Sequence, residues 1–104
     1  MKPTTPVTTP LAVARDHPAY AGHFPGNPIL PGVVILAEVM AVVERATSRA
    51  SHEWEVANAK FLAPVAPGAA LTLVHEMLDS GGVRFEVRSE AVLVASGSLV
   101  PRRA

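Results

Sequence analysis

The chain has 104 residues, of which 49% are hydrophobic and 17% charged, with nine basic residues balancing nine acidic ones and no cysteine. A chain of this length builds one domain, and we expect a single domain over residues 1–104 with residues 1–6 frayed. The balanced charge argues against nucleic-acid binding through a basic surface. The lack of cysteine excludes disulfides, thiolate metal sites and a cysteine nucleophile.

The first ten residues are rich in threonine and proline and lack the apolar stretch of a signal peptide. The longest uninterrupted apolar run, residues 33–37, is far too short to cross a membrane. We therefore expect a cytoplasmic protein.

The next segments predict one strand and one loop. Residues 7–14 have strand character, but Pro10 donates no backbone hydrogen bond and so confines this strand to the edge of a sheet or to a bulge. Residues 16–31 contain four prolines and two glycines, a density that the interior of a helix or strand does not tolerate. This segment is predicted to be a shaped loop.

Residues 33–51 contain neither glycine nor proline and predict one helix. Its apolar residues recur at helical spacing and share one face: Ile35, Leu36, Val39, Met40 and Val43. Polar residues lie roughly opposite: Glu38, Arg45, Ser48 and Arg49. Valine lowers the intrinsic helix propensity, so burial against a sheet must stabilise this helix.

The rest of the chain is strand-like, with strands expected over residues 54–62, 70–78, 83–88 and 92–100. Residues 80–82, Ser-Gly-Gly, are a hairpin signal between the second and third of these. Together with the N-terminal strand, this order predicts an α+β fold in which one long central helix packs on a five-stranded antiparallel sheet.

The most informative segment is GHFPGNPILPGVV, residues 22–34, which places His23 in a proline-stiffened loop just before the predicted helix. The first backbone N–H groups of a helix have no partner within it and suit a developing oxyanion. A neutral imidazole beside them can remove a proton from the carbon next to a polarised carbonyl. The structural alternative is that His23 only satisfies backbone groups of its loop.

This segment resembles the signature of the 3-hydroxyacyl-acyl-carrier-protein dehydratases, the FabZ and FabA enzymes of the hotdog fold. A second segment, AKFLAPVAPG over residues 59–68, resembles the strand and Pro-Gly turn that follow the helix in that family. The resemblance spans about residues 16–100. The short N-terminus makes the chain similar to the compact dehydratase-like proteins of aryl-polyene and related lipid pathways.

The resemblance assigns roles to several residues. His23 is implied to be the catalytic base, the carbonyl of Ile29 to orient its imidazole, and the N–H of Gly32 to hold the thioester oxygen. Other residues of the same segment are implied to bind substrate: Phe24, Pro31 and Val33. No metal ligand is expected, because the four histidines lack metal-ligand spacing, and the thioester acidifies C2 without a cofactor.

One position departs from the family pattern. The family has an acidic residue on the helix where this chain has Ala37, and the nearby carboxylate, Glu38, comes one residue later. One residue on a helix is a turn of about 100°. Glu38 should therefore point away from the family's acidic position. It is still predicted to assist catalysis, through an irregular helix start or from the helix of the other subunit, and otherwise a water or another side chain takes its place.

The predicted activity is dehydration, or the reverse hydration, of a 3-hydroxyacyl thioester carried on acyl-carrier protein, in fatty-acid or related lipid and polyene biosynthesis. Two alternatives stay open: a hotdog acyl-thioesterase, and a catalytically reduced acyl-binding subunit paired with an active paralogue, which Ala37 favours. The resemblance also implies a homodimer or higher even oligomer, whose sheets join edge to edge so that His23 of one subunit faces the helix of the other.

Overall fold

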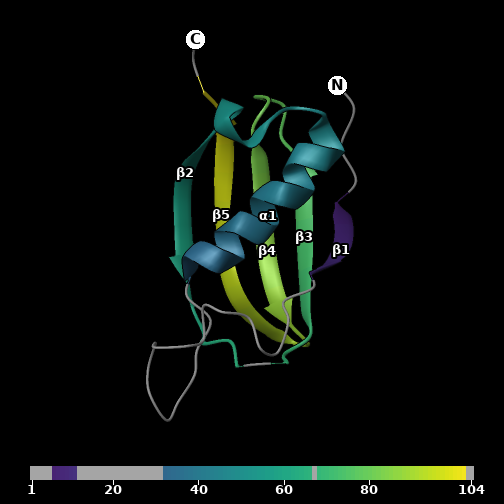
Figure 1. Cartoon of the computed structure of the whole chain (residues 1–104), viewed down its shortest axis with the longest axis vertical. Helices are drawn as coiled ribbons and strands as arrows, with labels where there is room; N and C mark the ends of the chain where they lie inside the picture. The colour runs from purple at the N-terminus through teal and green to yellow at the C-terminus, as the bar shows by residue number, and fades with distance from the viewer. Residues whose placement is uncertain (1–5, 12–31, 67, 103–104) are drawn as a thin grey trace.

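The computed structural model describes residues 6–11, 32–66 and 68–102. Five antiparallel strands form one sheet in the order β1-β3-β4-β5-β2, and helix α1 crosses one face of it diagonally (Figure 1). The elements have these bounds: β1 Val7–Leu11, α1 Gly32–Thr47, the 3₁₀ turn η2 Ser51–Glu53, β2 Trp54–Phe61, β3 Leu71–Met77, β4 Val83–Ser89 and β5 Val92–Pro101. The α+β prediction of one helix on a five-stranded antiparallel sheet is confirmed.

The helix ends four residues earlier than the apolar pattern predicts. Ser48 adopts a left-handed conformation with φ of 56°, which breaks the helical path after Thr47. The Thr47 hydroxyl donates to the carbonyl of Val43 at 2.7 Å and so satisfies one carbonyl of the last turn. No described helix is long and apolar enough to cross a membrane.

The core lies between α1 and the sheet. The helix buries Ile35, Val39, Val42 and Val43, whereas Leu36 and Met40, expected on the same face, are half-buried at its border. The sheet contributes the alternate residues that face the helix: Leu71, Leu73 and His75 from β3, Val83, Phe85 and Val87 from β4, and Leu99 from β5.

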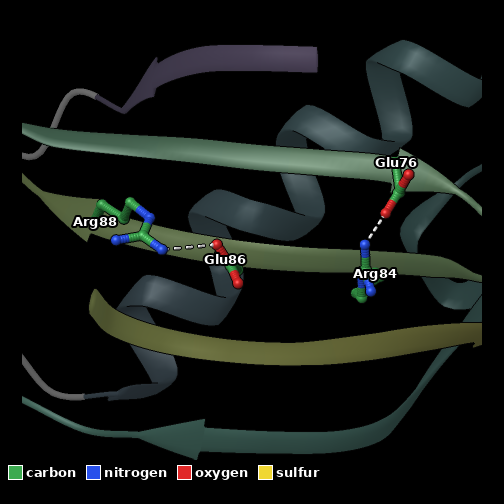
Figure 2. A network of polar contacts seen from close by, with 4 residues as sticks. All are labelled: Glu76, Arg84, Glu86 and Arg88. Carbon is green, nitrogen blue, oxygen red and sulfur yellow. Dashed lines mark hydrogen bonds and ion pairs between the residues drawn. The ribbon is translucent and has the colours of Figure 1, made fainter. Parts of the chain in front are cut away.

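The opposite face of the sheet is polar. Arg84 pairs with Glu76 on the neighbouring strand, and Arg88 pairs with Glu86 at 3.2 Å, with the helix behind the strands (Figure 2). The amide of Asn58 also donates to the Ser98 hydroxyl at 2.8 Å. This face is therefore exposed to solvent, and the buried apolar residues lie on the helix side of the sheet.

Strand β2 contains a β-bulge. Val56 lies opposite Leu99 and Asn58 opposite Ser98, so Ala57 is an extra residue with no partner on β5. Beyond the bulge the alternation is reversed, and Phe61 lies opposite the buried Ala95 on the helix side of the sheet.

Candidate functional site

The described part of the site is the start of α1, which lies beside the end of β2 at one edge of the sheet (Figure 1). Gly32 is the first residue of the helix, as the sequence predicts to within one position. The first four N–H groups of the helix have no acceptor within it and carry the positive end of its dipole. This helix start can therefore hold a carbonyl oxygen on which negative charge develops.

The described site residues are Gly32, Val33 and Glu38. Val33 is 71% exposed at the helix start, so its side chain is open to a bound molecule. Four predicted site residues lie outside the described residues: His23, Phe24, Ile29 and Pro31.

The helix turns Ala37 and Glu38 in different directions. Because α1 is continuous from Gly32 to Thr47, the offset of about 100° between the two positions applies in full. Ala37 is exposed on the side away from the sheet, and Glu38 is half-buried on the flank. The irregular helix start that would bring Glu38 to the family's acidic position is absent.

Ala37 lines a shallow hollow of about 350 Å³ on the outer side of the helix, together with Met40, Ala41 and Glu44. Glu44 shares the helix face of position 37 but lies seven residues, or roughly 10 Å, further along the axis. Glu44 is not among the site residues predicted from the sequence. Its i+7 spacing from Ala37 is the signal that would have placed a carboxylate on the same face of the helix.

The sequence analysis also missed the contact between Phe61 and Gly32. A Cβ atom built on Gly32 would lie 2.8 Å from Cζ, 2.9 Å from Cε1 and 3.0 Å from Cε2 of Phe61. These distances are shorter than van der Waals contact, so a side chain at position 32 would have to displace the ring of Phe61. Phe61 stands in the second family-like segment and Gly32 in the first, and the fold brings the two segments together here.

A second histidine, His75, is buried in the core. It is 4% exposed on the helix side of β3, and none of the described residues hydrogen-bonds to its Nδ1. Burial lowers the pKa of His75, because the charged imidazolium would lose its hydration. Its neighbour Glu76 faces the other side of the sheet, as expected for adjacent strand residues. Within the described ranges, no cluster of three potential metal ligands occurs.

One helix lying across a five-stranded antiparallel sheet is the architecture of a hotdog protein. The sequence profile of the ApeI-like dehydratases matches residues 2–98. The chain belongs to this ApeI-like dehydratase family.

Individual proteins of known sequence are also similar to this chain. The 3-hydroxyacyl-[acyl-carrier-protein] dehydratase FabZ of Ehrlichia chaffeensis is 31% identical over 107 residues, which cover 94% of this chain and 75% of the relative. Across the first curated relatives, the chain spans 58 to 75% of their length.

Solved structures show the same fold. The dehydratase heterocomplex ApeI:P from Xenorhabdus doucetiae superposes with a TM-score of 0.70 at 24% identity, over 94% of this chain and 88% of that one. A mutant of the fluoroacetyl-CoA-specific thioesterase FlK has a TM-score of 0.69 at 14% identity, over 95% of this chain and 91% of that one. At these identities the likeness concerns the fold alone.

Proposed function

We propose that this protein dehydrates a 3-hydroxyacyl thioester carried on acyl-carrier protein, or catalyses the reverse hydration. The observation that carries the proposal is the helix start at Gly32, which is the last residue of the family-like segment GHFPGNPILPG. Membership of a dehydratase family and the 31% sequence identity with a FabZ dehydratase support dehydration as the reaction class. The reaction serves fatty-acid biosynthesis or a related lipid or polyene pathway.

In the proposed mechanism, the imidazole of His23 removes a proton from C2 of the substrate. The N–H of Gly32 hydrogen-bonds the thioester oxygen and stabilises the negative charge that develops there. The electron pair of the broken C–H bond forms the C2–C3 double bond while the C3–O bond breaks. The imidazolium of His23 returns its proton to the departing hydroxyl, which leaves as water, and the neutral base is restored. The carbonyl of Ile29 orients the imidazole, and other residues contact the acyl thioester: Phe24, Pro31 and Val33.

The proposed assembly is a dimer joined through the β2 edges of two sheets. Among the described residues β2 pairs only with β5, and it carries Val56 at 40% exposure and Phe61 at 48% on its open side. An edge strand of this kind needs a cover, and a second copy supplies one. In this arrangement His23 of one subunit faces α1 of the other.

A second candidate function is an acyl-binding subunit that pairs with an active paralogue. Ala37 favours it, because no carboxylate stands at the position where the family has an acid. The structural relative from Xenorhabdus doucetiae is itself a heterocomplex.

The decisive experiment incubates the purified protein with 3-hydroxyacyl and 2-enoyl thioesters of acyl-carrier protein and follows the products by mass spectrometry. We expect loss or addition of water, and a rate at least ~10²-fold lower for His23→Ala, because a general base contributes that much. Circular dichroism of the variant checks its fold. Thioester hydrolysis would identify a thioesterase, and no change in any substrate would favour the acyl-binding subunit.

The acidic position has its own test. Glu38→Gln should leave turnover within about twofold of wild type, because the helical phase carries Glu38 away from that position. Ala37→Glu should raise turnover by about tenfold or more, since a placed acid assists departure of the hydroxyl. Ala37 is exposed, so the substitution should not disturb packing. Loss of activity in Glu38→Gln would contradict the assignment.

A further inference from the structure

The contact between Gly32 and Phe61 joins two elements that are remote in the sequence. The Cβ position of Gly32 is nearly equidistant from three outer atoms of the ring, at 2.8, 2.9 and 3.0 Å. Nearly equal distances to Cζ, Cε1 and Cε2 place that point above the face of the ring. The first residue of α1 therefore rests with its backbone on a flat aromatic surface.

Several features of the sheet fix this ring. The bulge at Ala57 reverses the alternation of β2, and Phe61 consequently faces the helix. Directly after it, the N–H of Leu62 donates to the carbonyl of Val94 at 2.7 Å, which anchors the strand end to β5. The support under Gly32 is thus held by the sheet and is independent of α1 itself.

Only part of the surface of the Phe61 ring contacts Gly32. Phe61 is 48% exposed, an unusual exposure for a phenylalanine whose ring packs against a helix. The proposed dimer covers the exposed part of the ring. The other part contacts Gly32 at the end of the helix, which is where a helix frays.

We propose that Phe61 is a positioning residue that fixes the backbone of Gly32 for binding the thioester oxygen. The inference rests on the proposed function, which assigns the N–H of Gly32 to that oxygen. Such a donor accelerates the reaction only if it is already in place when charge develops. A flat ring beneath Gly32 provides that preorganisation.

The kinetic test compares Phe61→Ala and Phe61→Tyr with Val7→Ala, a control that removes an exposed apolar side chain from the opposite edge strand, β1. Phe61→Ala should lower kcat by roughly tenfold to a hundredfold with KM within about threefold, because the lost interaction acts in the transition state. Phe61→Tyr keeps the ring face and should retain wild-type kcat within about threefold. Val7→Ala should behave as wild type, and sedimentation checks that all variants share one oligomeric state.

A double-variant cycle tests the contact itself. In Gly32→Ala the new Cβ must displace the ring, while alanine improves helix propensity. Thermal stability should therefore stay close to wild type although kcat falls about as far as in Phe61→Ala. Adding Gly32→Ala to Phe61→Ala should lower kcat little further, since the ring is already gone, whereas the effects of Gly32→Ala and Val7→Ala should multiply. Multiplicative effects for the first pair would overturn the proposal.

A readout without turnover separates this inference from the proposed function. The order parameter of the Gly32 and Val33 N–H vectors, from ¹⁵N relaxation, should fall from about 0.85 in the wild type toward about 0.6 in Phe61→Ala and stay high in Phe61→Tyr. An inactive wild type would defeat the proposed function and leave this measurement to decide the role of Phe61. Unchanged order parameters, or a mobile helix start with unchanged kcat, would overturn the positioning role.

Discussion

The two edges of the sheet are built differently. Strand β1 has five residues, includes the exposed Pro10, and pairs with β3 without interruption. Strand β2 has eight residues and no proline, contains a bulge, and exposes Val56 and Phe61 on the helix side. Proline opposes pairing of an edge strand with another chain. The described part of the β1 edge is thus protected at Pro10, while the β2 edge is open and also adjoins the helix start.

In the proposed dimer, assembly and chemistry share the β2 side of the molecule. Phe61, at the end of β2, supports the first residue of α1. A change at the β2 edge should therefore reach the site, and an equivalent change at β1 should not. Three experiments test this contrast.

The largest effect is expected from Gly97→Ala, which attacks the bulge of β2. A Cβ on Gly97 would lie 2.3 Å from the carbonyl oxygen of Asn58 and 2.9 Å from Cζ of Phe85. The free energy of unfolding should fall by about 3 kcal/mol, as for other overpacked cores. On the other edge, Pro10→Ala should change it by less than about 1 kcal/mol. Urea titration measures both, and equal losses would refute the contrast.

A charged residue on each edge tests assembly. Val56 on β2 is 40% exposed and Val7 on β1 is 50% exposed, so lysine can be accommodated at either position. In sedimentation at low micromolar concentration, Val56→Lys should convert the dimer to a monomer, because an edge lysine opposes strand pairing. Val7→Lys should remain dimeric. A dimer that survives Val56→Lys would place the interface elsewhere.

The smallest effect concerns His75, next to the β1 edge and opposite Val7 in the register. Burial lowers its pKa in the folded protein, so below its usual value of about 6.5 the unfolded chain takes up a proton that the native state refuses. Stability should decline as pH falls from 7.5 to 5.5, by no more than ~1.4 kcal/mol per pH unit from this one group. His75→Leu should remove this component, which urea titrations at the two pH values would reveal. An unchanged pH dependence would exclude His75 as its source.

The sequence alone predicts the local elements well. Glycine and proline punctuation separates them, and alternation in residues 83–88 identifies a half-buried strand. The helix end is misplaced because Ser48, with φ of 56°, stops it where no glycine gives a signal. The fold class follows from the order of these elements, since one helix can cover only one face of the sheet.

The non-local features of the site escape such reasoning. Neither Ala57 nor Asn58 is a glycine, so the sequence of β2 does not mark the bulge. The space for the bulge comes from Gly97, which lies on β5 and forty residues after Ala57. The approach of Phe61 to Gly32 depends in turn on that bulge. The bulge and the approach of Phe61 to Gly32 arise only when the strands and the helix pack together, so the residue pattern of one strand cannot reveal them. The catalytic role proposed for His23 rests on resemblance to the family.

The extra residue in β2 also determines where this strand can change its length. Because Val56 lies opposite Leu99 and Asn58 opposite Ser98, deletion of Ala57 would leave a regular strand in which Phe61 still lies opposite Ala95. A deletion that left the bulge in place would instead turn Phe61 to the polar face. Homologues without the bulge should therefore be one residue shorter at this position and keep the aromatic ring beneath the helix start.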